Sequence, residues 1–240
     1  MKLDARAKLF LFLTTLFVTA LVVGDIIGGK LFIAFGITMS VGMIPFPVTF
    51  LLTDLLNEFY GKRSARLVTF MGMAAAIFTI LILMVAVEVP FAPFTFAADW
   101  GGVTKPAVDQ IFAASQKILI ASVIAYVIAQ FIDIGVFHML KRLTRNRFLW
   151  LRATGSTVVS QAIDTAAINL LVWTGTLPFE KIVAVAAASY VGKLAIAVAL
   201  TPAVYACHAL VERVFGIRPV VLGADGEPVD EPPAWPPASA

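Results

Sequence analysis

The sequence has little charge and only one cysteine. Asp, Glu, Lys and Arg together make up 14% of the 240 residues, whereas hydrophobic residues make up 60%. A soluble domain is nearer one quarter charged, so this chain has too little polar surface to cover a globule in water. The single cysteine, Cys207, excludes an internal disulfide and a metal site built from several cysteines.

Several catalytic and nucleotide-binding motifs are also absent. The sequence contains no Walker A loop, no H-E-x-x-H, no G-x-S-x-G and no C-x-x-C. We therefore expect a protein that does not hydrolyse ATP by itself, and no motif points to an enzyme, a metal site or a cofactor. The net charge of +3 is small and forms no separate basic face, so nucleic acid is not an expected partner.

What the sequence has instead is long apolar runs. Six of them are long enough for a membrane span, which takes ~20 residues. They predict an all-α integral membrane protein with a bundle of six transmembrane helices, because a β-barrel would show short alternating segments. The expected helices cover residues 7–33, 38–60, 65–87, 111–140, 149–174 and 182–211. Residues 1–215 would form this domain, and the proline-rich, acidic stretch 216–240 is expected to be a disordered cytoplasmic tail.

The basic residues predict the orientation of the helices. They gather before the first expected helix, between the second and third, between the fourth and fifth, and after the sixth. The other ends of the helices carry few basic residues. Because Lys and Arg are enriched in cytoplasmic loops, both termini are expected to be cytoplasmic.

The fifth expected helix carries a polar stripe. Thr157, Gln161 and Asp164 fall within about 60° of one another around the helix axis. Asp164 is expected near the bilayer centre, since it lies ~18 Å along the helix from Arg152. An ionisable residue at that depth indicates a functional site. The alternative is a row of hydrogen bonds that joins neighbouring helices.

The fourth expected helix carries a similar stripe of Tyr126, Gln130 and Asp133. An aromatic ring, an amide and a carboxylate together suit a planar heterocycle, because the ring stacks and the polar groups bind its edge. The alternative is that Asp133 pairs with a basic residue of a neighbouring helix.

Lys193 in the sixth expected helix has apolar residues on both sides and is too deep to reach the membrane surface easily. We expect it either to neutralise Asp164 or to contact a substrate. Asp25 and Lys30 lie near the outer end of the first expected helix, where an interfacial cap is the favoured interpretation.

Two carboxylates, Asp54 and Glu58, stand one helical turn apart in the stretch FLLTDLLNEFYG. Asp54 lies ~10 Å inside the end of its helix, so it is expected to face a cavity. Glu58 lies nearer the headgroups, which favours an inner gate or an ion pair with the basic loops.

Four stretches together resemble the bacterial queuosine precursor transporter family. They are FPVTFLLTDLLNEFYGKRSAR, AQFIDIGVFHMLKR, FLWLRATGSTVVSQAIDTAAIN and YVGKLAIA. The resemblance covers roughly residues 8–212 and implies a multi-pass protein of the bacterial inner membrane. It also implies uptake of the 7-deazaguanines preQ0 and preQ1, small molecules that are salvaged for queuosine modification of tRNA.

The family's polar positions correspond here to Asp54, Glu58, Gln130, Asp133, Arg152, Ser156, Gln161, Asp164 and Lys193. With the two polar stripes, the expected substrate-binding residues are Asp54, Tyr126, Gln130, Asp133, Thr157, Gln161, Asp164 and Lys193. The expected gating or ion-pairing residues are Glu58, Arg152 and Ser156. No catalytic or metal-binding residue is expected.

Other functions remain open at this point. They are uptake or substrate binding for another small vitamin or heterocycle, an intramembrane enzyme that uses paired carboxylates, and a structural subunit. Besides lipid and substrate, the partners left open are a second copy of the chain and an external energy-coupling module.

Overall fold

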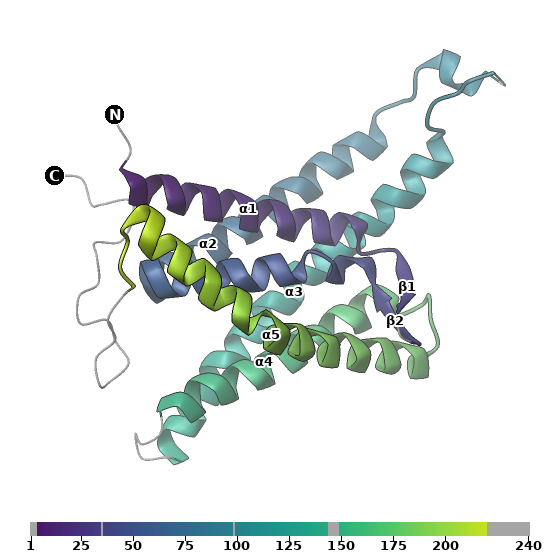
Figure 1. The fold of residues 1–240 in the computed structure, drawn as a ribbon. Helices are drawn as coiled ribbons and strands as arrows, with labels where there is room; N and C mark the ends of the chain where they lie inside the picture. Colours follow the sequence, from purple (N-terminus) through teal and green to yellow (C-terminus); the bar gives the residue numbers. More distant parts are fainter. Residues whose placement is uncertain (1–3, 35, 98, 144–148, 220–240) are drawn as a thin grey trace.

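The structure is a computed structural model that describes residues 4–34, 36–97, 99–143 and 149–219. These residues form five long helices and one β-hairpin (Figure 1). In chain order the elements are α1 (Ala5–Ile27), β1 (Leu31–Ala34), β2 (Ile37–Ser40), the short 3-10 helix η1 (Val41–Met43), α2 (Phe46–Glu88), the short 3-10 helix η2 (Pro93–Phe96), α3 (Lys105–Leu143), α4 (Leu149–Trp173) and α5 (Phe179–Phe215).

Four helices of the described chain are long and apolar enough to cross a membrane. They are Ala5–Ile27, Arg63–Glu88, Lys105–Ala129 and Phe179–Phe215, and a shorter apolar helix covers Val158–Trp173. Most of their residues are not buried inside the protein, as expected for surfaces that face lipid. The expected class, a helical membrane protein with several spans, is therefore confirmed.

α2 reverses its direction at Gly61. Gly61 has φ 78° and ψ 167°, a conformation that is essentially restricted to glycine. Before it, Tyr60 contacts the start of α1; after it, Gly72 packs against Phe17 further along α1. Residues 46–60 thus run antiparallel to α1 and the rest of α2 runs parallel to it, so the prediction that a helix ends at Gly61 is confirmed.

The region between α1 and α2 differs from the prediction. A helix was expected to continue to residue 33 and the next to begin at residue 38, but Leu31–Ala34 and Ile37–Ser40 pair as antiparallel strands. α1 ends at Ile27, just before Gly28 and Gly29, and α2 begins only at Phe46. The helical part of the second segment, residues 46–60, is therefore only ~22 Å long.

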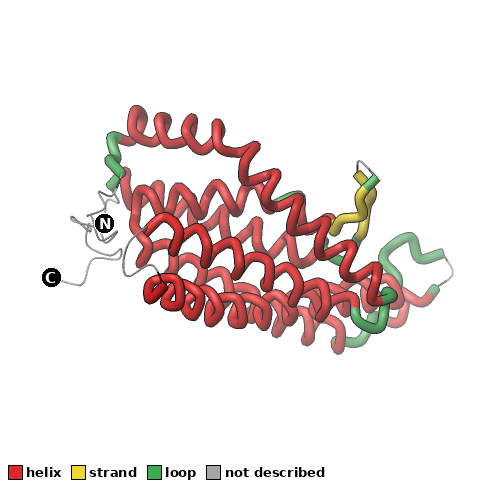
Figure 2. The backbone as a smooth tube through the Cα atoms, turned by 90° about the horizontal axis from the view of Figure 1, so that it is seen from below, coloured by secondary structure: helices red, strands yellow, loops and turns green. Residues whose placement is uncertain are grey.

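Glycines let this region pack tightly. A Cβ added to Gly42 would lie 2.9 Å from the carbonyl oxygen of Gly24, and one on Gly24 would contact Pro45. The Ser40 hydroxyl also donates to the Gly28 carbonyl at 2.7 Å. The hairpin and η1 are thereby held against the end of α1, and Figure 2 shows the strands at the end of the molecule opposite the termini.

A buried core joins the start of α1 to both segments of α2 and to the end of α5. Its members are Leu9, Phe10, Leu13, Phe17, Leu52, Leu55, Leu56, Phe59, Tyr60, Ala65, Val68, Val211 and Ile217. Polar contacts support it at the reversal, where Arg6 donates to the Phe59 carbonyl at 2.6 Å and the Tyr60 hydroxyl donates to the Arg6 carbonyl at 2.8 Å. These two bonds fix the end of the first segment of α2 against α1.

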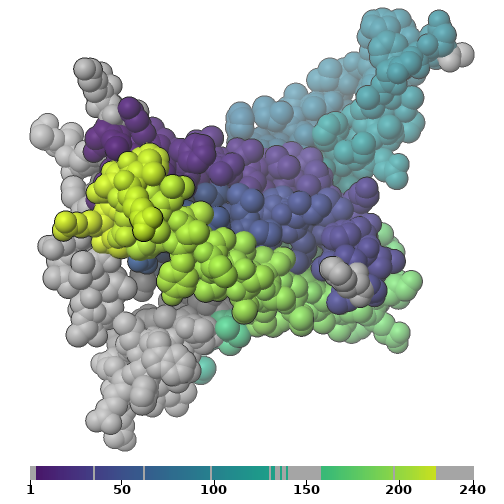
Figure 3. Space-filling view, in the orientation of Figure 1, coloured from purple at the N-terminus to yellow at the C-terminus, as the bar shows by residue number. Residues whose placement is uncertain are grey.

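α3 connects the remaining helices. Leu119 is fully buried against Ala76 and Leu83 of α2, while Ile118 and Ala121 pack against Val172 of α4. In the space-filling view, the hairpin and the first segment of α2 occupy the surface between α1 and α5 (Figure 3). The second segment of α2 and the first part of α3 extend away from this group together (Figures 1 and 3).

Candidate functional site

An ammonium and a carboxylate meet between α4 and α5. Lys193 Nζ lies 3.5 Å from Asp164 Oδ2 and 3.1 Å from the Thr165 hydroxyl. The Lys193 and Asp164 side chains are 18% and 17% exposed, so they are largely withdrawn from solvent but still reachable. This confirms one of the two contacts expected for Lys193, the pair with Asp164.

A second carboxylate, Asp25 of α1, lies within electrostatic range of Asp164. The Ser122 hydroxyl of α3 donates to Asp25 Oδ1 at 2.8 Å. The other oxygen, Oδ2, is buried and has no hydrogen-bond partner among the side chains and backbone that the structure describes. Asp25 is thus part of the polar interior, and the expectation of an interfacial cap was wrong for this residue.

We call Asp25, Ser122, Asp164, Thr165 and Lys193 the polar cluster. Ser122 and Lys193 lie near the middle of α3 and α5, and Asp164 lies ~14 Å from the Trp173 end of α4. Residues from four helices therefore converge well inside the bundle. Because charged groups at such depth are costly unless paired, the cluster indicates function.

An aromatic ring lies beside the Lys193 ammonium. Lys193 Nζ lies 5.3 Å from the centre of the Phe46 ring, a cation–π contact with the first residue of α2. A Cβ added to Gly192 would lie 3.1 Å from Met43 Cε and 3.7 Å from Met39 Sδ. The hairpin, η1 and the start of α2 therefore pack against α5 at Gly192 and Lys193.

Two predicted site residues, Gln161 and Tyr126, lie about one helical turn from members of the polar cluster. Gln161 is exposed and precedes Asp164 by one turn of α4. Tyr126 follows Ser122 by one turn on the same face of α3, and its hydroxyl interacts with Thr69 of α2. The aromatic side chain that the structure brings to Lys193 is Phe46 instead.

Asp54 and Glu58 follow Phe46 along the first segment of α2. Asp54 is partly buried, about two turns from Phe46. Glu58 Oε1 lies 3.5 Å from His208 Nε2 of α5, and Glu212 lies 3.8 Å from the other nitrogen of this imidazole. The structure thus buries Asp54 more than Glu58 and gives Glu58 a histidine neighbour that the sequence did not reveal.

The side chains of five predicted residues lie outside the described part of the structure. They are Gln130, Asp133, Arg152, Ser156 and Thr157. Among the residues described, no group of three or more His, Cys, Asp or Glu side chains could hold a metal ion.

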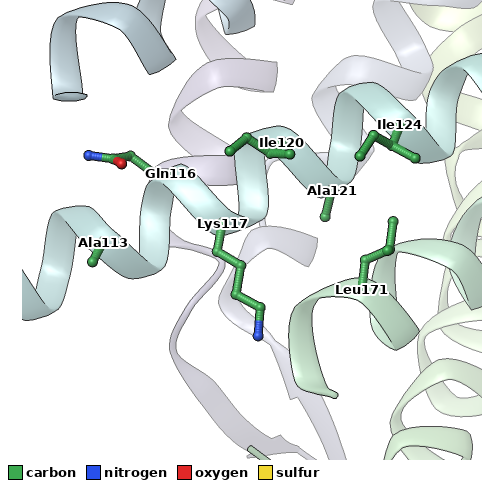
Figure 4. Close-up of a pocket in the computed structure, with 7 residues that line it drawn as sticks. All are labelled: Ala113, Gln116, Lys117, Ile120, Ala121, Ile124 and Leu171. Atoms are coloured by element: carbon green, nitrogen blue, oxygen red, sulfur yellow. The ribbon is translucent and has the colours of Figure 1, made fainter. Parts of the chain in front are cut away.

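A groove on the surface of α3 is separate from the polar cluster. Figure 4 shows Lys117, Ala121 and Leu171 facing one another between α3 and α4, whereas Gln116 points away. The groove has a volume of about 320 Å³, and Lys117 Nζ donates to the Thr174 carbonyl at 3.3 Å. It contains no carboxylate, so it lacks an acceptor for the adjacent N–H donors of a purine-like ring.

Sequence reasoning did not predict Asp25, Ser122 or Phe46 as members of the site. The stretch GDIIGGK carried a signal for Asp25, since two adjacent glycines can end a helix. A helix that ends at these two glycines leaves the hairpin beyond Asp25, so Asp25 then lies farther from the membrane surface. Ser122 and Phe46 gave no comparable signal within apolar sequence.

Comparison with known proteins adds a family. A family model described as "Putative vitamin uptake transporter" matches residues 40–207. The sequence is 28% identical over 178 residues to the "Probable queuosine precursor transporter" of Bacillus subtilis, covering 74% of this chain and 75% of that protein. No solved structure matches the chain.

Two further relatives match a shorter region. The "Queuosine precursor transporter" of Escherichia coli is 31% identical over 126 residues, and the "Probable queuosine precursor transporter" of Haemophilus influenzae is 32% identical over 124 residues. Each match covers 52% of this chain, and 51% and 47% of the two relatives, so about half of each relative's length is aligned.

Proposed function

Since the chain belongs to the vitamin uptake transporter family, we propose that it imports the queuosine precursors preQ0 and preQ1 across the bacterial inner membrane. Its curated relatives bear the name queuosine precursor transporter, which supports this substrate class. The family and the apolar helices make the chain a multi-pass membrane transporter, not an enzyme.

Six spans with both termini in the cytoplasm are part of the proposal. The reversal at Gly61 divides α2, so the described chain has six helical segments. The start of α1 packs against the end of α5, and an even number of crossings brings the two ends of a chain to the same side. The basic loops favour the cytoplasm for that side.

The observation that carries the proposed substrate site is the Asp164–Lys193 pair inside the bundle. It lies beside the start of the short segment 46–60, where helical backbone gives way to η1 and the hairpin. Interrupted helices at membrane depth are tolerated where they line a cavity or are buried in protein, and in transporters they often border the substrate site.

The chemistry of a 7-deazaguanine suits this pair. Its N1–H and exocyclic amine are adjacent donors that one carboxylate accepts together, and its O6 accepts from an ammonium or amide. Asp164 would take the two donors and Lys193 would donate to O6, so substrate would replace part of their long mutual contact. Phe46 would stack on the ring, and Gln161 would bind its edge from the next turn.

The remaining predicted residues have proposed roles along the same route. Tyr126 would line the path on α3, and Asp54 would bind substrate as it leaves toward the end of the molecule that holds the termini. Glu58, paired with His208, would belong to an inner gate. Gln130, Asp133 and Thr157 remain proposed substrate-binding residues, and Arg152 and Ser156 remain proposed gating residues.

Uptake of labelled preQ0 and preQ1 into cells unable to synthesise them tests the proposal. An Asp164→Asn variant should lose most uptake of both compounds. Asp109→Asn is the matched control, since its partly exposed carboxylate pairs with Lys105 in the first turn of α3, ~20 Å along that helix from Ser122 of the polar cluster. Uptake by Asp164→Asn at the wild-type rate would exclude the Asp164 charge from substrate binding.

Thermal stability in detergent separates this substrate class from another small vitamin. preQ0 and preQ1 should raise the Tm of the purified protein, whereas other heterocyclic vitamins should not. Stabilisation only by a different heterocycle would replace the proposed substrate. The mass of the detergent-solubilised complex would show whether the chain works as a single copy, as a homodimer or with an energy-coupling module.

A further inference from the structure

The polar cluster holds one more acidic group than basic groups. Of the charged side chains that the structure describes there, Asp25 and Asp164 are acidic and Lys193 is basic. With all three ionised, the cluster would carry a net negative charge inside the membrane domain. Uncompensated charge at that depth is costly, so a further positive charge is needed.

The contacts show which carboxyl lacks a partner. Asp164 has Lys193 at 3.5 Å, whereas Asp25 receives one hydrogen bond from Ser122 on Oδ1. Its Oδ2 is buried without a partner in the described part of the chain. The missing positive charge is therefore expected at Asp25.

The space around Asp25 favours a proton over a larger cation. An ammonium group or a hydrated ion needs room for a non-hydrogen atom beside the oxygen, but Oδ2 is enclosed by protein. A proton adds almost no volume. It converts the carboxylate into a neutral carboxyl group and brings the cluster to zero net charge.

We propose that Asp25 is the proton-carrying residue of this transporter, and that binding and release of that proton are coupled to substrate movement. This inference rests on the proposed function. The coupling follows from proximity: the charge on Asp25 acts on Asp164, which belongs to the proposed substrate site. By linkage, substrate bound at Asp164 and Lys193 must change the proton affinity of Asp25 by the same factor that the proton changes substrate affinity.

The cycle balances in charge and protons. From the outside, one proton binds the Asp25 carboxylate and one substrate binds the Asp164–Lys193 pair. At the cytoplasmic side both leave, and Asp25 returns to its starting state. Lys193 has Asp164 or substrate as its partner at each step of the cycle.

The test uses the full-length protein in proteoliposomes and sodium-free buffer. Wild type, Asp25→Asn and the control Asp109→Asn are assayed in two modes for preQ0 and preQ1. The first is exchange of labelled for unlabelled substrate without a gradient. The second is accumulation when the outside is acidic, for which about one pH unit can drive about tenfold accumulation at one proton per substrate.

Wild type and Asp109→Asn should exchange and accumulate both compounds. Asp25→Asn should keep exchange within about threefold of wild type but lose accumulation under the gradient. Accumulation by Asp25→Asn at the wild-type level would overturn the proposal, as would wild type that exchanges substrate but ignores the gradient. Wild-type protein that exchanges substrate but ignores the gradient would leave the proposed function intact.

Two other outcomes point elsewhere. preQ1 carries an aminomethyl group that is an ammonium when protonated, whereas preQ0 carries a nitrile at that position. If Asp25→Asn loses exchange of preQ1 but keeps that of preQ0, Asp25 binds this ammonium and the proton proposal fails. If wild type exchanges neither compound, the proposed function fails and takes the coupling with it.

A second measurement covers an Asp25→Asn protein that fails to fold. preQ0 carries no ammonium, so its addition to purified wild type in weakly buffered detergent reports protons that the protein binds or releases. A pH-dependent proton change approaching one per protein supports the proposal, and no change at any pH overturns it. Ser122→Ala, which keeps the carboxyl but removes its donor, should shift the pH at which that change is half-maximal.

Discussion

Replacing Gly61 by alanine is expected to weaken the whole fold through one backbone position. Gly61 has φ 78° and ψ 167°, which side-chain-bearing residues almost never adopt. Holding an alanine there costs about 1–3 kcal/mol. If the backbone relaxed toward a helix instead, α2 would become a continuous helix of 43 residues, ~64 Å long and about twice the thickness of the hydrocarbon core.

Relaxation would also break the contacts at the reversal. Arg6 donates to the Phe59 carbonyl, and the Tyr60 hydroxyl donates to the Arg6 carbonyl. Each such bond contributes about 1 kcal/mol. Whichever way the chain responds, Gly61→Ala is expected to lower the free energy of unfolding by about 1–3 kcal/mol, equivalent to a fall in Tm of roughly 2–12 °C for a protein of this size.

Thermal unfolding of the detergent-purified protein, followed by tryptophan fluorescence, measures this change. Gly101→Ala is the matched control, because its added Cβ meets no atom within 4 Å and its φ lies outside the left-handed region. The control should change stability by less than about 0.5 kcal/mol. A Gly61→Ala protein with the Tm of the control would refute the assignment of a strained, glycine-dependent reversal.

Three further changes test the packing and the polar cluster. Leu119→Ala should cost about 2–5 kcal/mol in thermal unfolding because Leu119 is fully buried, whereas Ile120→Ala, at a side chain 46% exposed, should cost much less; equal losses would contradict the packing of α3. Gly42→Ala should lower the yield of folded protein, as its Cβ would lie 2.9 Å from a backbone oxygen, and a normal yield would argue against this close approach. Lys193→Met should destabilise the protein by about 2 kcal/mol by leaving Asp164 unpaired, and the added change Asp164→Asn should restore part of the Tm; no restoration would show that the two residues are not coupled.

The helices could be predicted from the sequence because membrane spans need long apolar runs. The ends of helices at Gly61 and near Trp173 agree with the prediction, since glycine and polar turns interrupt those runs. The hairpin could not be predicted, because a short apolar run such as Leu31–Ala34 has no period that separates strand from helix. Its pairing with Ile37–Ser40 depends on where α1 ends.

The candidate site could also be predicted only in part from the sequence. Asp164 and Lys193 could be predicted to pair, because each is a charge in an apolar helix with few other partners. The contact of Lys193 with Phe46 and the electrostatic link between Asp164 and Asp25 could not be predicted, because both depend on where α1 ends and on how the chain between α1 and α2 folds back. The prediction placed Asp25 near the membrane surface because it extended the first helix to residue 33, whereas α1 ends at Ile27.

The core that joins Leu9 and Phe10 to Val211 and Ile217 has a consequence for how the protein is made. α1 is synthesised first, and its partners at the end of α5 emerge about 200 residues later. During synthesis, part of the apolar face of α1 must therefore face lipid until the last helix is inserted. A ribosome that stops before Val211 would leave an inserted chain whose first helix lacks its last partner, so quality-control proteases would have a structural means of recognising incomplete copies.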